Sequence, residues 1–197
     1  MGHRHPERLI GIHLNLLSGL VTSLPVTTPT QEERAYLSQL AEWQKEGRGY
    51  ALVQGTRPQT LAFAMTDSPA GLAAWICDKF RAWSGGYIDA IPRDAMLANI
   101  ALYWFTGAIG SSFWPYYARH HGPPLMPAGA TIDVPAGYAD FPNEIIRPPR
   151  SVASRVFTDL RHWTVMERGG HFAALEQPEA LARDIRDFFR PLRTATR

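Results

Sequence analysis

A histidine and two carboxylates stand in two separate loops and could together perform acid-base chemistry. His171 follows Gly169 and Gly170, whose backbone freedom can present an imidazole close to the end of a strand. Asp140 and Glu144 lie in an earlier loop, and either carboxylate could orient the imidazole as the acid of a hydrolase triad does. The alternatives are a histidine that packs over a turn and a carboxylate that caps a helix, and spacing alone does not decide between them.

Three tyrosines could supply hydrogen-bond donors to a reacting oxygen. Tyr50, Tyr116 and Tyr117 lie in a long segment rich in helix signals. A phenol in that segment could stabilise the charge of a developing alkoxide. The alternative is that these aromatic rings only pack the segment together.

Other features argue against a zinc or disulfide site. His120 and His121 are adjacent and therefore point to opposite sides of most backbones, which is a poor arrangement for binding a metal. Cys77 is the single cysteine, so neither an intrachain disulfide nor a cysteine-cluster zinc site can form. We expect no metal, and we expect a reducing, cytoplasmic location.

Apolar periodicity predicts the elements that must position these residues. Expected strands cover 9–17, 130–135 and 162–166. Expected helices cover 31–46, opened by a capping box at Thr30-Gln31-Glu32-Glu33, then 68–83, a helix from 94 to Gly107 or Gly110 with Leu97 on its apolar stripe, 151–159 and the segment from Pro178. Strands and helices alternate toward the end of the chain, which favours an α/β fold with a parallel sheet. The helices between the first two strands indicate an inserted lid. We predict a core of residues 1–20 and 128–197 and a helical lid of residues 21–127.

Composition limits the class of partner. Of the 197 residues, 45% are hydrophobic and only 19% are charged, with a formal net charge of +2. The hydrophobic fraction is enough to fill a sizeable core. The net charge is too small to favour nucleic acid as a partner. No apolar run approaches the roughly 20 residues that cross a membrane. We therefore expect no membrane span.

Several strings of residues follow one another in a specific order. They are His5-Pro6-Glu7-Arg8 with Gly11-Ile12-His13-Leu14-Asn15, Gln54-Gly55-Thr56-Arg57-Pro58-Gln59-Thr60, Asp67-Ser68-Pro69-Ala70-Gly71-Leu72, Phe141-Pro142-Asn143-Glu144, and Arg168-Gly169-Gly170-His171-Phe172. With this order and spacing, the whole chain resembles the second half of the α/β-hydrolase-fold epoxide hydrolases of the microsomal and juvenile-hormone type. The fold implied is a partial α/β-hydrolase fold, with the last three parallel strands, flanking helices and a lid inserted after the first strand.

The resemblance implies a role for four residues. His171 matches the general base that activates water, and Glu144 matches the acid that orients this base. Tyr50 and Tyr116 match the two lid tyrosines that bind the epoxide oxygen. The family uses neither a metal nor an organic cofactor, and its substrates imply a small hydrophobic epoxide.

The resemblance also implies a nucleophile that this chain lacks. In the family, an aspartate on a Gly-x-Asp-x-Gly-like elbow attacks the epoxide and forms an alkyl-enzyme ester. None of the aspartates of this chain lies in such an elbow, and the resemblance would place the elbow before Met1. We predict that the chain alone does not form the ester.

Two further hypotheses remain open at this stage. The first is a non-catalytic remnant that binds hydrophobic ligands or a partner, either a second copy or a missing N-terminal half, through an exposed strand at 9–14. The second is another hydrolase of the same fold, such as a dehalogenase or an esterase. The two lid tyrosines favour epoxides over the latter.

Overall fold

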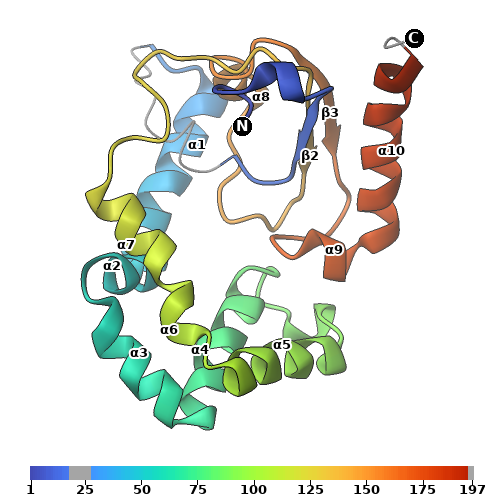
Figure 1. Cartoon of the computed structure of the whole chain (residues 1–197). Helices are drawn as coiled ribbons and strands as arrows, with labels where there is room; N and C mark the ends of the chain where they lie inside the picture. Colours follow the sequence, from blue (N-terminus) through green and yellow to red (C-terminus); the bar gives the residue numbers. More distant parts are fainter. Residues whose placement is uncertain (18–27, 195–197) are drawn as a thin grey trace. The chain divides into compact units, whose positions relative to one another are not determined.

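The computed structural model describes residues 1–17 and 28–194, and it divides the chain into two compact units. The first unit contains residues 1–40 and 125–197, and the second contains residues 41–124. Figure 1 shows the elements of both. The expected start of the lid, at residue 21, lies outside the described residues.

A three-stranded parallel sheet forms the centre of the first unit, which confirms the predicted partial α/β fold. Its strands are β1 (Ile12–Leu14), β2 (Ala136–Asp140) and β3 (Leu160–Val165), in the spatial order β1-β2-β3. The register aligns His13, Gly137 and His162 in one row across the sheet.

The second strand lies later in the chain than the sequence predicted. The apolar run 130–135 forms only one isolated bridge, between Ile132 and Phe157, and the strand follows it at Ala136–Asp140. Gly137 had indicated a loop. In the structure it is a strand residue that pairs with both β1 and β3. A Cβ atom there would lie 2.9 Å from the ring of Phe188, so a larger side chain would not fit. The first strand is also shorter than the expected 9–17.

Helices flank this sheet. They are the 3-10 turn η1 (Pro6–Arg8) and the α-helices α1 (Gln31–Glu42), α8 (Arg150–Ala153), α9 (Ala173–Glu176) and α10 (Pro178–Thr194). In Figure 1, α1 and α10 lie on opposite sides of the sheet. The start of α10 at Pro178 is confirmed, whereas the helix expected over 151–159 is reduced to the single turn α8.

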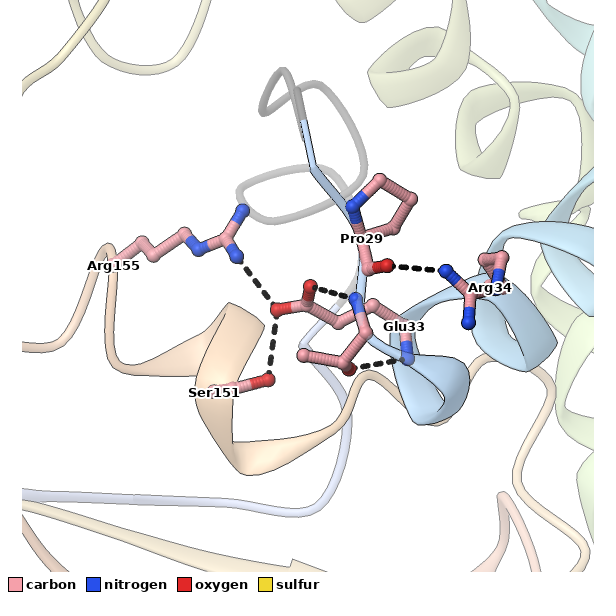
Figure 2. A network of polar contacts seen from close by, with 6 residues as sticks. Pro29, Glu33, Arg34, Ser151 and Arg155 are labelled. Atoms are coloured by element: carbon pink, nitrogen blue, oxygen red, sulfur yellow. Dashed lines mark hydrogen bonds and ion pairs between the residues drawn. The ribbon is translucent and has the colours of Figure 1, made fainter.

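Helix α1 begins at the predicted capping box and is attached to α8 and the turn after it. The backbone N–H of Thr30 donates to Glu33 Oε2 at 3.0 Å, and the N–H of Glu33 donates to Thr30 Oγ1 at 3.2 Å. Glu33 is buried, and its Oε1 accepts hydrogen bonds from Ser151 at 2.9 Å and Arg155 at 2.6 Å, as Figure 2 shows. One carboxylate thus caps a helix and joins it to a distant segment.

The second unit is helical. Its elements are the π-helix η2 (Trp43–Gly47), α2 (Gly49–Thr56), α3 (Pro58–Asp67), α4 (Pro69–Ala82), η3 (Ile88–Ala90), α5 (Arg93–Thr106), α6 (Ile109–Ser112) and α7 (Trp114–His121). Its core includes Ala62, Met65, Leu72, Ile109 and Phe113.

Local signals account for the helices that were predicted in this unit. Ser68 caps α4 by accepting a hydrogen bond from the N–H of Gly71 at 3.0 Å. Gly107 ends α5 with a φ of +63°, a left-handed conformation that glycine adopts without strain. Helices α2 and α3 had not been predicted, although Pro58 stands at the first position of α3, where proline is favoured.

The apolar stripe predicted for α5 is only partly covered. No residue of α5 is buried, and Leu97, which the periodicity placed on the inward stripe, is 50% exposed. Among the described residues, no helix combines the length and the apolar character that crossing a membrane requires.

Candidate active site

A backbone connection joins the two loops that carry the catalytic candidates. The N–H of Asn143 donates to the carbonyl oxygen of Gly169 at 3.0 Å, and an isolated parallel bridge pairs Asn143 with Gly170. Gly169 has a φ of +104°, and a Cβ atom there would lie 2.9 Å from the ring of Phe141. Glycine is required at this position for both reasons.

This connection brings His171 and Glu144 together. Nδ1 of His171 lies 2.8 Å from Oε1 of Glu144, and the same oxygen accepts a hydrogen bond from the N–H of Ile145 at 2.7 Å. The Glu144 side chain is fully buried, while 23% of the His171 side chain is exposed. A carboxylate that accepts from Nδ1–H leaves Nε2 as the nitrogen that takes up a proton, which is the tautomer a general base needs.

The other carboxylate has a different partner. Asp140 ends β2 and accepts two hydrogen bonds from the guanidinium of Arg147, at 2.7 Å from Nε and 3.0 Å from Nη2. This is the bidentate geometry of a strong arginine-carboxylate pair. Of the two carboxylates that the sequence left open, Glu144 contacts the imidazole, and Asp140 binds Arg147.

A third carboxylate near the pair was missed at the sequence level. Oε1 of Glu176 accepts a hydrogen bond from the N–H of Phe172 at 3.0 Å. Burial raises the pKa of Glu176, and the charge of Glu144 raises it further. Glu176 lies four residues after the N-cap Phe172, whereas a capping box has a spacing of three, so this standard sequence signal does not mark it.

In the second unit, the structure brings Tyr50 and Tyr116 together. Their rings meet edge to face with centroids 5.8 Å apart, and both side chains are half-buried. Burial raises the pKa of Tyr50 and of Tyr116, and the nearby Tyr116 phenol raises the pKa of Tyr50 further. Both phenols are therefore protonated donors at neutral pH.

The surroundings of the tyrosine pair are aromatic and cationic. The Trp83 ring lies 5.2 Å from that of Tyr50, and the Lys79 ammonium lies 4.9 Å from the Tyr50 ring centroid. Tyr117 instead packs against His121, with ring centroids 4.1 Å apart, and is exposed. The candidate residues thus form two groups, one in each unit: an imidazole-carboxylate pair and a phenol pair.

Comparisons with known proteins give these groups a context. The chain is 41% identical over 196 residues to a protein of Stigmatella aurantiaca assigned as an epoxide hydrolase, covering 98% of this chain and 44% of the relative. It is 40% identical over 152 residues to epoxide hydrolase 1 of Sus scrofa, covering 71% of this chain and 33% of the relative. The chain belongs to the epoxide hydrolases of the α/β-hydrolase fold.

Solved epoxide hydrolases share the fold. The chain superposes on the Aspergillus niger epoxide hydrolase with a TM-score of 0.80 at 26% identity, covering 97% of this chain and 48% of that one. For the juvenile hormone epoxide hydrolase of Bombyx mori, the TM-score is 0.81 at 26% identity, and the superposition covers 100% of this chain and 52% of that one. The chain thus spans about half the length of these solved epoxide hydrolases, and less than half of the curated relatives above. No protein-family model matches it.

Proposed function

We propose that this chain supplies the general base and the oxygen-binding tyrosines of an epoxide hydrolase, and that the nucleophile lies outside these 197 residues. The observation that carries the proposal is the hydrogen bond between His171 Nδ1 and Glu144 Oε1 at 2.8 Å, in a chain related to epoxide hydrolases. The substrate class would be a small hydrophobic epoxide, and the product a vicinal diol.

The tyrosines serve the first half of this reaction. An aspartate nucleophile attacks a ring carbon and breaks the carbon-oxygen bond, so that negative charge develops on the epoxide oxygen. Tyr50 and Tyr116 donate hydrogen bonds to that oxygen, and one of them passes it a proton. Two neutral phenols stabilise the transition state more than the uncharged substrate, which is the condition for catalysis.

The imidazole serves the second half. His171 accepts a proton at Nε2 from a water molecule, and the resulting hydroxide attacks the ester carbonyl. The imidazolium returns this proton to the departing alkoxide, which gives the diol, and the carboxylic acid left on the nucleophile returns a proton to the tyrosine that had donated one. Glu144 holds the ring through Nδ1–H and stabilises the imidazolium that forms. The buried side chain of Glu144 supports this role, because a charge shielded from water interacts more strongly with its partner.

Hydrolysis by the isolated chain tests the absence of a nucleophile. The chain is incubated with styrene oxide in heavy-oxygen water, and the diol is measured by mass spectrometry. We expect no diol above the level of the matched His171→Gln variant. Rapid diol formation by the isolated wild-type chain would overturn this part of the proposal.

A chimera tests the assigned residues. Residues 1–197 replace the matched segment of the Stigmatella aurantiaca relative, which supplies the remaining part of the molecule. We expect the chimera to form diol and the His171→Gln chimera to accumulate the alkyl-enzyme ester without releasing it. Equal turnover in the two chimeras would contradict the role of His171.

A second candidate function is association through the sheet edge. Among the described residues, β1 pairs only with β2 and is the end strand of the sheet, and the preceding Ile10 is 51% exposed. An end strand with apolar surface favours pairing with a further strand. Sedimentation of the wild type and of Ile10→Lys tests this function: we expect self-association that the substitution weakens, and a monomeric wild type would contradict it.

A further inference from the structure

A second cluster of ionisable side chains lies apart from the His171–Glu144 pair. His13 on β1, His162 on β3 and Asp184 on α10 converge on one face of the sheet. Nε2 of His13 lies 2.7 Å from Asp184 Oδ2, and Nε2 of His162 lies 2.8 Å from Oδ1 of the same carboxylate. The proposed epoxide chemistry uses none of these three residues.

We propose that His13, His162 and Asp184 bind a divalent transition-metal ion of the zinc type. Two imidazole nitrogens and one carboxylate are a ligand set that such ions prefer. The three residues come from three elements, so a bound ion would link both outer strands of the described sheet to the C-terminal helix.

The distances are close to those of a metal site. The ligand atoms of the three residues all lie within 4.8 Å of one another. Zinc-ligand bonds of about 2.0–2.2 Å at the tetrahedral angle that zinc prefers place neighbouring ligand atoms about 3.4 Å apart. The observed nitrogen-oxygen distances of 2.7 and 2.8 Å are shorter, so the side chains must move apart by about 0.6–0.7 Å when the ion binds.

Binding also requires a change of tautomer. In the described arrangement, each Nε2 contacts the carboxylate as a hydrogen-bond donor. Coordination needs the Nε2 lone pair, so the proton of each neutral imidazole must move to Nδ1. Each imidazole stays neutral during this exchange.

The environment holds the three side chains in place. The Phe188 ring lies 5.8 Å from that of His13 and 6.0 Å from that of His162, and Gly137 between them has no side chain to separate the two. The side chains of His13 and Asp184 are 5% and 6% exposed, whereas His162 is 26% exposed. His162 thus offers the side from which an ion enters and a water ligand is retained.

A threonine hydroxyl lies next to the cluster. Thr164 Oγ1 lies 3.1 Å from His162 Nε2 and could serve as a further oxygen ligand of the ion.

The competing explanation is a hydrogen-bond network in which Asp184 only fixes two histidines. His162→Gln separates the two explanations, because the glutamine amide can still donate a hydrogen bond to Asp184 but is a poor ligand for zinc. His121→Gln is the matched control: His121 is exposed on α7 and lies outside the cluster.

The test uses the chain after treatment with a chelator, titrated with zinc chloride by calorimetry and followed by thermal unfolding. We expect one zinc ion per chain, a higher unfolding temperature with zinc, and an affinity at least about tenfold weaker in His162→Gln. His121→Gln should bind as the wild type does. Absence of binding, or equal affinity in wild type and His162→Gln, would overturn the proposal in favour of the network.

A second measurement does not depend on the folding of a variant. The imidazole nitrogen resonances of the wild type are recorded by NMR with and without zinc. Coordination should shift the Nε2 signals of His13 and His162 and convert both rings to the Nδ1–H tautomer, with the signals of His171 unchanged. Zinc-induced shifts confined to other histidines would overturn the assignment.

Discussion

Nδ1 of His171 lies 2.8 Å from Oε1 of Glu144, although the two residues are 27 positions apart in the sequence. The contact exists because the Asn143–Gly169 backbone hydrogen bond joins the two loops directly next to these side chains. A pair positioned by backbone hydrogen bonds keeps the imidazole in one orientation, which a general base requires.

Glu144→Gln tests this orientation in the chimera with the Stigmatella aurantiaca relative. We expect release of the alkyl-enzyme ester to slow by about 10²-fold or more, because the amide no longer stabilises an imidazolium. Single-turnover kinetics separate ester formation from ester hydrolysis and should show that only hydrolysis slows.

Asp140→Asn is the control for Glu144→Gln. It also removes a carboxylate charge near the site, but this carboxylate binds Arg147 and not His171. We expect reduced stability and an unchanged rate constant for ester hydrolysis. A larger loss of hydrolysis in Asp140→Asn than in Glu144→Gln would exchange the roles assigned to the two carboxylates.

The tyrosine pair should affect the other half of the reaction. In the same chimera, Tyr50→Phe and Tyr116→Phe should each slow ester formation by about 10²- to 10³-fold, the usual loss when one donor to a developing oxyanion is removed. Tyr117→Phe is the control, because Tyr117 is exposed and packs against His121. Rapid-quench measurement of the ester gives the rates, and three equal rates would refute the assignment.

The buried carboxylate of Glu33 predicts a dependence of stability on pH. A backbone hydrogen bond from Thr30, a hydrogen bond from Ser151 and the charge of Arg155 hold the pKa of Glu33 below its ordinary value. The stabilisation is therefore fully present above a pH of about 4.5, the value for an unfolded glutamate. It is lost as the pH falls through the lower pKa of the folded state.

Glu33→Gln should remove this acid-dependent loss and lower the urea midpoint at neutral pH. Glu32→Gln is a suitable comparison, since Glu32 is the exposed neighbour on the same turn of α1. Urea unfolding between pH 3 and pH 7 measures both variants. An acid dependence in Glu33→Gln equal to that of the wild type would show that other carboxylates cause it.

The sequence predicted elements whose signals are local. Thr30 with Glu33, Ser68 and Gly107 each act within four residues of their own position, and the helix ends that they marked are found in the structure. The choice between Asp140 and Glu144 could not be made in this way. It depends on Arg147 and on the backbone pairing of two loops, which residue types and spacing do not reveal.

The sequence placed the second strand at 130–135 and not at Ala136–Asp140, because its position also depends on contacts with residues distant in the sequence. Gly137 indicates a turn when only its neighbours are considered, but it pairs with β1 and β3, and the distant Phe188 packs on it where a larger side chain would not fit. The cluster of His13, His162 and Asp184 likewise joins three distant segments. Tertiary packing, absent from local patterns, determines both features.

Gly137→Ala tests how closely the rings of Phe188 and His13 pack on Gly137. An added Cβ atom would lie 2.9 Å from the Phe188 ring and 3.0 Å from the ring of His13, closer than van der Waals contact allows. Because β2 is the central strand, neither ring can move without disturbing its contacts with α10 or β1. We expect a loss of about 1–3 kcal/mol in the free energy of unfolding, the usual cost of overpacking a core.

Gly49→Ala is the matched control, since no atom lies within 4 Å of a Cβ built at Gly49 in α2. Alanine in a helix is favoured over glycine by about 0.5–1 kcal/mol, so this variant should be as stable as the wild type or more stable. Denaturant unfolding compares the two. Equal stability of Gly137→Ala and the wild type would mean that Phe188 does not pack closely on Gly137 in solution. In that case Phe188 would not hold His13 and His162 in place either.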